Sequence, residues 1–213
     1  MSGRFDLFHT LDKEKQLRIM NAAMNEFAKN GFKRASTNEI VKQADIGKGM
    51  LFYYFGNKKE LFDFLCEYTI EFIRNEYLIK FSCDTGDFVE RYQKLTEVKR
   101  RVMKEFPQAI RFYERLCLSE NEEFYEEYME NVMGIRDGII QKLYDNLDYS
   151  LLRDDLEPQT TITYIHWLMD SYEDDLTARF RSGRISSSDE TAAANEWEHF
   201  YSFLNDLRKL FYK

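Results

Sequence analysis

Residues 36–61 read STNEIVKQADIGKGMLFYYFGNKKEL and contain two short helical segments separated by a tight turn. Ser36 and Glu39 have the spacing of a capping box, which predicts that a helix begins directly after Ser36. Residues 45–47 are too few for anything but a turn, and their final glycine is tolerated as the cap of a second helix. Asn57 repeats the capping pattern, with a glutamate three residues later, and begins a third helix. The stretch therefore predicts a helix-turn-helix, whose second helix enters the major groove of DNA.

The whole chain is predicted to be helical. Its 213 residues include only two prolines and nine glycines, the residues that most often interrupt helices. No stretch alternates in the manner of a strand over a convincing length. The sequence therefore predicts an all-α fold, and Ser187 with Glu190 forms a further capping box before its last helix. The predicted helices cover residues 12–30, 37–44, 48–55, 58–81, 87–105, 108–118, 121–147, 158–180 and 187–211.

Charge is distributed unevenly along the chain. The whole sequence has a net charge of −8, from 30 Lys and Arg against 38 Asp and Glu. Residues 1–60 contain 11 basic and 7 acidic residues, a net of +4, whereas residues 61–213 contain 19 and 31, a net of −12. A cationic N-terminal part on an acidic body suits a protein that presents one end to a polyanion. Chance clustering of charge is the alternative, and the difference alone does not decide between them.

Other features argue against a membrane protein, a secreted protein and an enzyme. No apolar run approaches the roughly 20 residues that span a bilayer, and the N-terminus lacks the order of a signal peptide. The cysteines, Cys66, Cys83 and Cys117, fit neither a disulfide framework nor a zinc site, so we expect a cytoplasmic protein. The three histidines lie far apart, and residues 47–49 lack the remaining glycines of a phosphate-binding loop. We therefore expect no catalytic residue, no metal and no cofactor.

The helix-turn-helix stretch resembles the DNA-binding region of the TetR (tetracycline-repressor-like) family of bacterial transcription regulators. The resemblance covers residues 12–62 and includes FAKNGF at 27–32, TNEIV at 37–41 and GKGMLFYYF at 47–55. It implies a helix-turn-helix DNA-binding domain at residues 1–57. It also implies a helical ligand-binding and dimerisation domain at residues 58–213, joined to the first by the long helix that begins at Lys58.

Eight residues are predicted to contact DNA, in part because the resemblance places them where the family contacts its operator. Thr37 lies in the first turn of a helix, where backbone N–H groups and the helix dipole favour a phosphate. Gly49 permits close approach of the backbone, and Lys48 suits a guanine. Leu51 and Phe55 are instead predicted core residues. The predicted contacts are Thr37, Asn38, Lys48, Gly49, Met50, Tyr53, Tyr54 and Lys58.

The sequence departs from the family's common pattern at two positions in this stretch. Gly47 stands where a serine is usual, which removes a hydroxyl cap and one phosphate contact. Phe52 stands where a tyrosine is frequent, so that side chain packs but donates no hydrogen bond. Tyr54 has an open alternative as well, since it could be buried against the first predicted helix. We expect thinner DNA contacts at positions 47 and 52 without a change of fold.

Two predicted helices near the C-terminus carry apolar stripes. The resemblance implies that they form a four-helix bundle between two subunits, so we expect a homodimer. The alternative is that both stripes belong to the core of one chain, and one helix can serve both roles with different faces. The predicted interface residues are Ile165, Leu168, Tyr172, Leu176, Trp197, Phe200, Tyr201 and Leu204.

The resemblance also implies an effector pocket in the body, since such regulators release DNA when a small molecule binds. Methionines and aromatic residues suit an adaptable apolar cavity, although each of them could equally be ordinary core. His166 in particular has the alternative of a hydrogen-bonded core histidine. The predicted pocket residues are Tyr92, Met103, Phe106, Tyr113, Cys117, Met129, Met133, His166 and Trp167.

These features together predict a ligand-responsive DNA-binding transcriptional regulator. The expected form is a repressor that a small molecule releases from a palindromic operator. Its expected partners are double-stranded DNA, a second copy of the chain and an effector. The alternative is a helical protein-interaction module that has lost DNA binding, which the changes at Gly47 and Phe52 leave open.

Overall fold

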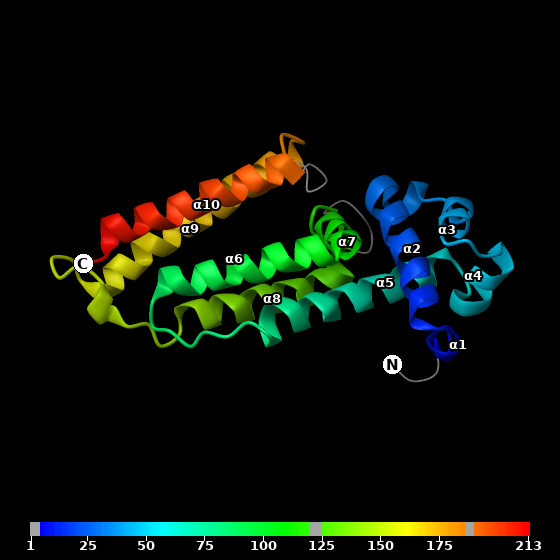
Figure 1. Cartoon of the computed structure of the whole chain (residues 1–213), viewed down its shortest axis with the longest axis horizontal. Helices are drawn as coiled ribbons and strands as arrows, with labels where there is room; N and C mark the ends of the chain where they lie inside the picture. Colours follow the sequence, from blue (N-terminus) through cyan, green and yellow to red (C-terminus); the bar gives the residue numbers. More distant parts are fainter. Residues whose placement is uncertain (1–4, 120–124, 186–189) are drawn as a thin grey trace. The chain divides into compact units, whose positions relative to one another are not determined.

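The computed structural model describes residues 5–119, 125–185 and 190–213, and in these ranges the chain is helical and forms no named strand (Figure 1). The all-α prediction is therefore confirmed. The chain divides into two compact units. Unit 1 comprises Met1–Lys80 and Arg100–Arg136, and unit 2 comprises Phe81–Lys99 and Asp137–Lys213. The predicted domain boundary after residue 57 stays a prediction.

Local capping signals define the helices of the N-terminal region. The Ser36 hydroxyl accepts a 3.4 Å hydrogen bond from the Glu39 N–H, and the Asn57 side chain accepts one of 3.0 Å from the Glu60 N–H. Both predicted caps are thereby confirmed, and the predicted turn at residues 45–47 separates the two short helices. The helices of this region are α1 (Asp6–His9), α2 (Lys13–Arg34), α3 (Thr37–Gln43), α4 (Lys48–Phe55) and α5 (Lys58–Ile73).

Helix α1 is a single turn that the sequence pattern does not predict. Its Phe8 side chain is fully buried. The Phe8 ring packs at 4.8 Å from Phe55 of α4 and at 5.3 Å from Phe64 of α5, measured between ring centroids. Segment α1 therefore completes the apolar core beneath the helix-turn-helix.

The rest of unit 1 joins α2 to helices that follow much later in the chain. Phe62 of α5 packs edge-on against Phe27 of α2 at 5.1 Å and against Phe112 of α7 (Pro107–Cys117) at 5.7 Å. Gly31 interrupts α2 with φ of 68°, and a Cβ there would lie 2.8 Å from the Arg115 guanidinium. The sequence predicts that the helix ends at Gly31, but Gly31 instead forms a kink, and α2 continues after it to Arg34.

Helix α5 does not continue to residue 81 as predicted, because a π-helix at Arg74–Ile79 follows its last α-helical turn. The carboxylate of Glu76 lies in this π-helix and is buried. It accepts hydrogen bonds from Lys80 and, at 2.9 Å, from Arg101 of α6 (Phe88–Glu105). These two partners hold the pKa of the Glu76 carboxyl below its ordinary value.

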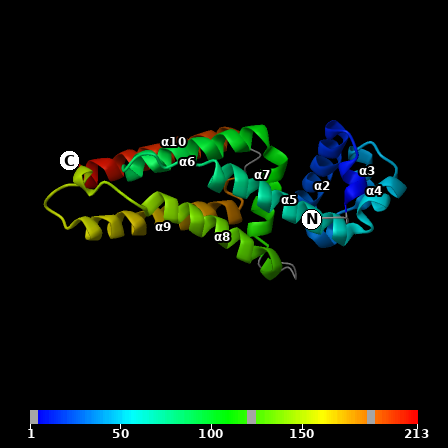
Figure 2. The same ribbon diagram turned by 90° about the horizontal axis from the view of Figure 1, so that it is seen from below.

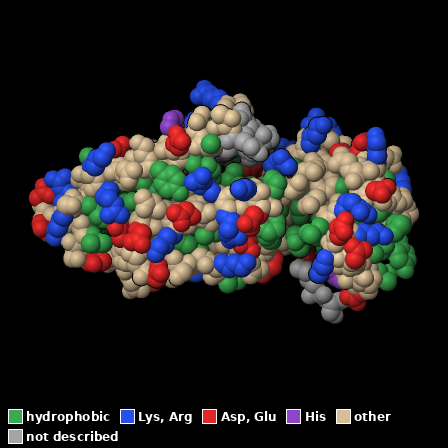
Figure 3. Space-filling view, in the orientation of Figure 1, with side chains coloured by type: hydrophobic (Ala, Val, Ile, Leu, Met, Phe, Trp, Pro, Cys, Tyr) green, Lys and Arg blue, Asp and Glu red, His purple; other side chains and the backbone are tan. Residues whose placement is uncertain are grey.

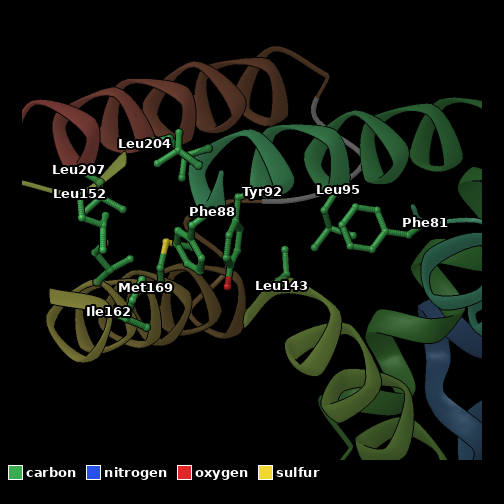
Figure 4. Packing of buried hydrophobic residues seen from close by; sticks show 12 residues of the cluster. Phe81, Phe88, Tyr92, Leu95, Leu143, Leu152, Ile162, Met169, Leu204 and Leu207 are labelled. Atoms are coloured by element: carbon green, nitrogen blue, oxygen red, sulfur yellow. The ribbon is translucent and has the colours of Figure 1, made fainter. Parts of the chain in front are cut away.

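Unit 2 is a bundle of α9 (Pro158–Arg181) and α10 (Glu190–Phe211) with the first part of α6 and the last part of α8 (Tyr125–Tyr144). Figures 1 and 2 show α9 and α10 as long neighbouring helices. One apolar cluster fills the space between the four helices, as Figure 4 shows for most of its members. The cluster contains Phe81, Phe88, Val89, Tyr92, Leu95, Leu143, Leu152, Ile162, Ile165, Met169, Leu204 and Leu207.

The α8 C-terminus is capped by a buried cation from α6. The guanidinium of Arg91 is 3% exposed and donates to the backbone carbonyls of Thr85, Lys142, Leu143, Asp145 and Asn146. Carbonyls at the end of a helix lack intrahelical partners and carry the negative end of the helix dipole. Arg91 therefore satisfies the last turn of α8 and fixes α6 against it. Pro158 begins α9 as predicted, whereas Ser187 of the last predicted capping box lies outside the described residues.

Candidate DNA-binding site

Two side chains of α2 hold α3 at both of its ends. The buried carboxylate of Glu26 accepts 2.8 Å and 2.9 Å hydrogen bonds, from the Ser36 N–H and the Asn30 side chain. Eight residues earlier, Arg18 Nε donates to the Ala44 carbonyl at the C-terminus of α3, at 2.9 Å. We name Arg18 and Glu26 the α3 clamp. Neither residue could be predicted from the sequence, because each acts on backbone groups distant in the chain and has no local pattern.

Recognition helix α4 has one buried face and one open face. Leu51 and Phe55 are each 1% exposed, so the prediction that they are core residues is confirmed. On the other face Tyr53 is 66% exposed and Met50 is 36% exposed, and Figure 3 shows hydrophobic side chains over α4 beside Lys and Arg side chains. A Cβ built on Gly49 would have no atom within 4 Å. The open face can therefore accept a close partner along the backbone.

The turn before α4 explains how so short a connection is made. Asp45 has φ of 50°, in the left-handed region that Asp tolerates better than most non-glycine residues. Gly47 then caps α4 with extended backbone angles, and it has no side chain that could accept a hydrogen bond from the first N–H groups of the helix. The first turn of α4 thus lacks a side-chain cap, which agrees with the loss expected from a glycine at this position.

Lys58 has a different environment from the one its sequence position suggests. Its ammonium donates to the carbonyls of Lys33 and Ala35, both at 3.2 Å, and lies 4.9 Å above the Phe32 ring. An ammonium has three N–H donors, so these bonds leave one for a phosphate. Lys58 therefore fixes the connection between α2 and α3 in addition to any contact with DNA.

The other predicted contacts differ in accessibility. Lys48 and Asn38 are exposed, at the starts of α4 and α3, and the Lys48 ammonium lies 5.9 Å from the Phe52 ring centroid. Thr37 is half-buried in the first turn of α3. Tyr54 is half-buried too, with its ring 6.2 Å from Phe8, so part of this side chain packs beneath the helix. Thus α3, α4 and the start of α5 bring the predicted contact residues into one region of unit 1.

A family model described as "Bacterial regulatory proteins, tetR family" matches residues 19–64. This range runs from within α2 through α3 and α4 into α5, which are the elements that build the site. The chain belongs to the TetR family. The resemblance seen in the sequence is confirmed, and the chain is a DNA-binding transcriptional regulator.

One sequence relative and two solved structures match most of this TetR-family chain. The "Fatty acid metabolism regulator protein" of Bacillus subtilis (strain 168) is 21% identical over 189 residues, which cover 78% of this chain and 90% of the relative. A TetR family transcriptional regulator from Chloroflexus aurantiacus superposes with a TM-score of 0.59 at 20% identity, over 98% of both chains. The ketosteroid transcriptional regulator KstR2 of Mycobacterium tuberculosis gives 0.60 at 15% identity, over 96% of this chain and 97% of that one. These solved structures confirm the TetR fold.

The predicted effector residues of this TetR-family chain fall into both compact units. Tyr92 is 6% exposed in the core of unit 2, where His166 Nδ1 lies 3.0 Å from the Tyr144 hydroxyl. His166 Nε2 also lies 3.3 Å from a carboxylate oxygen of Asp170, so this histidine is hydrogen-bonded as its alternative interpretation required. The indole of Trp167 is 61% exposed, so this side chain lies at the surface of α9, and its place in the effector pocket stays a prediction. The residues that lie in unit 1 are Met103, Phe106, Tyr113, Cys117, Met129 and Met133.

Tyr113 and Cys117 are the pair that the structure brings together in unit 1. They lie one turn apart on α7, hydrogen-bond each other and are partly buried. Burial raises the pKa of the Cys117 thiol to about 11, so the thiol is protonated at neutral pH. Phe106 and Met133 are instead exposed at the surface, at 39% and 42%. The effector site as a whole stays a prediction.

Two of the predicted dimer residues are buried inside the single chain. Ile165 and Leu204 are 0% exposed in the core of unit 2, so their prediction as surface for a second subunit is wrong. Tyr172 of α9 stacks at 4.7 Å on Phe203 of α10 and lies 5.2 Å from Phe200, so these side chains pack within the chain. Helix α9 also has a set of apolar side chains that are exposed. This set consists of Tyr164, Trp167 and Leu168, which are 39%, 61% and 39% exposed.

Other predicted interface residues are half-buried, namely Leu176, Trp197 and Tyr201.

In the part of the chain that the structure describes, no group of three or more His, Cys, Asp or Glu residues could hold a metal ion. None of the described helices combines the length and the apolar character needed to cross a membrane.

Proposed function

We propose that this TetR-family chain is a repressor that binds a palindromic operator as a homodimer and releases it when a small apolar effector binds. The open face of α4 is the observation that carries the proposal. It presents Lys48, Gly49, Met50 and Tyr53 to solvent while Leu51 and Phe55 anchor the helix from below. A helix held in this way can enter the major groove without unfolding its own core.

The proposed contacts divide by chemistry. Lys48 and Met50 read base edges, because a lysine suits guanine and a thioether suits the methyl group of thymine. Thr37, Tyr53 and the remaining donor of Lys58 bind phosphates, which set the register of the protein without reading sequence. Asn38 and Gly49 flank these groups on the same surface, and Tyr54 contributes only its hydroxyl.

A second copy of the chain is required by the size of the recognition helix. One helix of eight residues reads only a few base pairs, so useful specificity needs two helices on a two-fold axis. The exposed apolar side of α9, formed by Tyr164, Trp167 and Leu168, is the proposed centre of the dimer interface. Tyr201 of α10 is also a proposed interface residue. Tryptophan and tyrosine are enriched in such interfaces.

The regulated genes are proposed from the sequence relative. Because the Bacillus subtilis relative is named a fatty acid metabolism regulator and matches most of this chain, we propose that this chain controls genes of fatty acid metabolism in the cytoplasm. An acyl compound is then the proposed effector. The methionine and aromatic residues of the body, among them Met103, Tyr113 and Met129, suit such an apolar ligand.

Gel-shift titration against the protein's own upstream DNA tests the proposal. Lys48 and Lys58 supply four cationic contacts per dimer, which predicts that affinity falls roughly 100-fold between 50 and 200 mM salt. Lys48→Ala should weaken binding and flatten the salt dependence. Lys104→Ala removes an exposed lysine from α6 and is the matched control, which should behave as the unmodified protein.

A helical interaction module without DNA binding is the competing function. It predicts that no promoter fragment gives a shift that survives competitor DNA, and that outcome would overturn the repressor. Tyr53→Phe separates the two further, because it removes one hydroxyl from an exposed ring. Operator affinity should fall several-fold while helical content and dimerisation persist.

A further inference from the structure

A pocket of about 160 Å³ lies in unit 1, outside the helix-turn-helix and outside most of the predicted effector set. Three parts of the chain form it. Leu17, Met20, Asn21 and Met24 come from α2, and two aromatic residues come from α5. Residues at the junction of α6 and α7 close it. The pocket therefore joins the helix that carries the α3 clamp to helices of the body.

The walls of this pocket are aromatic and partly open to solvent. Phe72 of α5 and Phe106 meet edge-on with ring centroids 4.9 Å apart, and Tyr68 stacks on Phe64. Leu17, Tyr68 and Phe106 line the pocket and are 46%, 37% and 39% exposed. Figure 3 shows hydrophobic side chains gathered on the surface over α5 beside α2. Exposed apolar side chains around one concavity mark a binding site more often than single scattered ones do.

Two amide side chains supply the polar groups of the pocket. Asn21 lines it from α2 and Gln108 from α7. Within the residues that the structure describes, neither side-chain amide has a hydrogen-bond partner in the protein. A ligand with one donor and one acceptor can satisfy either of them.

Charge restricts the ligand further. Glu105 is the charged residue of the lining, and its carboxylate lies 3.3 Å from Arg101, which also binds Glu76. The lining contains no Lys or Arg, so a carboxylate or phosphate would meet a negative group without a cation to bind it. Size gives the other limit, since a cavity of about 150 Å³ holds benzene whereas drug-sized ligands need roughly 300 Å³ or more.

We propose that this pocket binds a small, neutral, planar aromatic molecule carrying one amide or hydroxyl group, and that occupancy alters operator binding. The ligand-binding part of this proposal is argued from the pocket alone, whereas the regulatory part rests on the proposed function. A ligand there contacts α2, α5 and the start of α7 at once. It would therefore change how firmly α2, and with it the α3 clamp, is held by the body.

Benzamide is the probe, with benzoate as its isosteric anion, and binding to the full chain is measured by ligand-observed NMR or calorimetry without DNA. Benzamide should bind with a dissociation constant on the order of 1 mM, as its few atoms allow. Benzoate should bind at least 10-fold more weakly because of Glu105. Equal binding of the two, or no binding at 10 mM benzamide, would overturn the site.

Variants of pocket residues test whether benzamide binds in this pocket. Ala109→Phe fills the pocket and should abolish benzamide binding, and Leu210→Ala, at an exposed position of α10, is the control that should not. Asn21→Leu keeps the pocket but removes an amide, so benzamide should weaken about 10-fold while toluene binds as before. If both pocket variants bind benzamide normally, the ligand lies elsewhere and the proposal fails.

The regulatory part of the proposal is tested by measuring operator binding with and without benzamide. Saturating benzamide should change the operator dissociation constant at least 3-fold, and Asn21→Leu should reduce that change. Benzamide binding with unchanged operator affinity would overturn the regulatory part alone. A chain that binds benzamide but no DNA would instead refute the proposed function and leave the pocket assigned.

Discussion

Replacing Gly49 with alanine should raise the stability of the protein and lower its affinity for DNA. Gly49 is the second residue of α4 and has helical backbone angles, so alanine fits the conformation. Glycine costs a helix roughly 0.5–1 kcal/mol relative to alanine. Because a Cβ at position 49 meets nothing within 4 Å in the protein, the full gain should appear in the free energy of unfolding. For a chain of this length, that gain corresponds to a rise in Tm of about 1–4 °C.

The same methyl group should obstruct DNA. Gly49 lies on the open face of α4 between Lys48 and Met50, where the backbone is proposed to approach the groove most closely. A displacement that costs about 1.4 kcal/mol per recognition helix reduces affinity tenfold, and a dimer presents the helix twice. On one preparation of Gly49→Ala, the free energy of unfolding from calorimetry should therefore rise while the operator affinity from gel-shift titration falls.

Gly134→Ala is the matched control for this experiment. Gly134 lies inside α8, and a Cβ there also meets nothing within 4 Å, so the stability gain should be similar. Operator affinity should stay unchanged, because α8 is not part of the proposed surface. If Gly49→Ala binds the operator as tightly as the parent, the backbone of α4 does not approach DNA and our assignment of this face is wrong.

Three further predictions concern other parts of the chain. Gly47→Ser should add the missing cap of α4, stabilise the protein by several tenths of a kcal/mol and tighten operator binding, whereas Gly47→Ala should not tighten it, as paired thermal melts and gel shifts would show. Arg91→Met should destabilise unit 2 by about 3–5 kcal/mol in denaturant titrations, because five carbonyl groups lose a cationic donor; a loss below 1 kcal/mol would contradict the capping role. The lowered pKa of Glu76 stabilises the folded chain above the carboxyl's unfolded pKa, and this contribution is lost as pH falls through the folded pKa. The stability advantage over Glu76→Gln, measured by melts from pH 7 to pH 3, should therefore shrink below about pH 4, and a constant advantage would refute this assignment.

The parts of the helix-turn-helix that depend on neighbouring residues could be predicted from the sequence. Ser36 and Asn57 cap the helices that follow them, because a capping side chain and its backbone partner are three residues apart. Leu51 and Phe55 are core residues, since their spacing sets one face of a short helix. The exposed residues between them follow from the same geometry.

Features that depend on distant contacts could not be predicted in this way. Glu26 and Arg18 act on backbone groups 10 and 26 residues away, and nothing in their local pattern indicates it. Phe8 lies in one isolated helical turn that has no periodicity to detect. An apolar stripe does not say whether the chain's own core or a second subunit covers it, so Ile165 and Leu204 were assigned to the wrong surface.

The α3 clamp also limits how the DNA specificity of this chain could be transplanted. A segment exchange that moves residues 36–56 into another regulator would carry the reading side chains but leave Arg18 and Glu26 behind. The incoming α3 would then arrive with its first N–H and its last carbonyl unanchored. A working chimaera therefore needs the donor's α2 as well, so the smallest exchangeable cassette begins before Arg18 and not at the first residue of the motif.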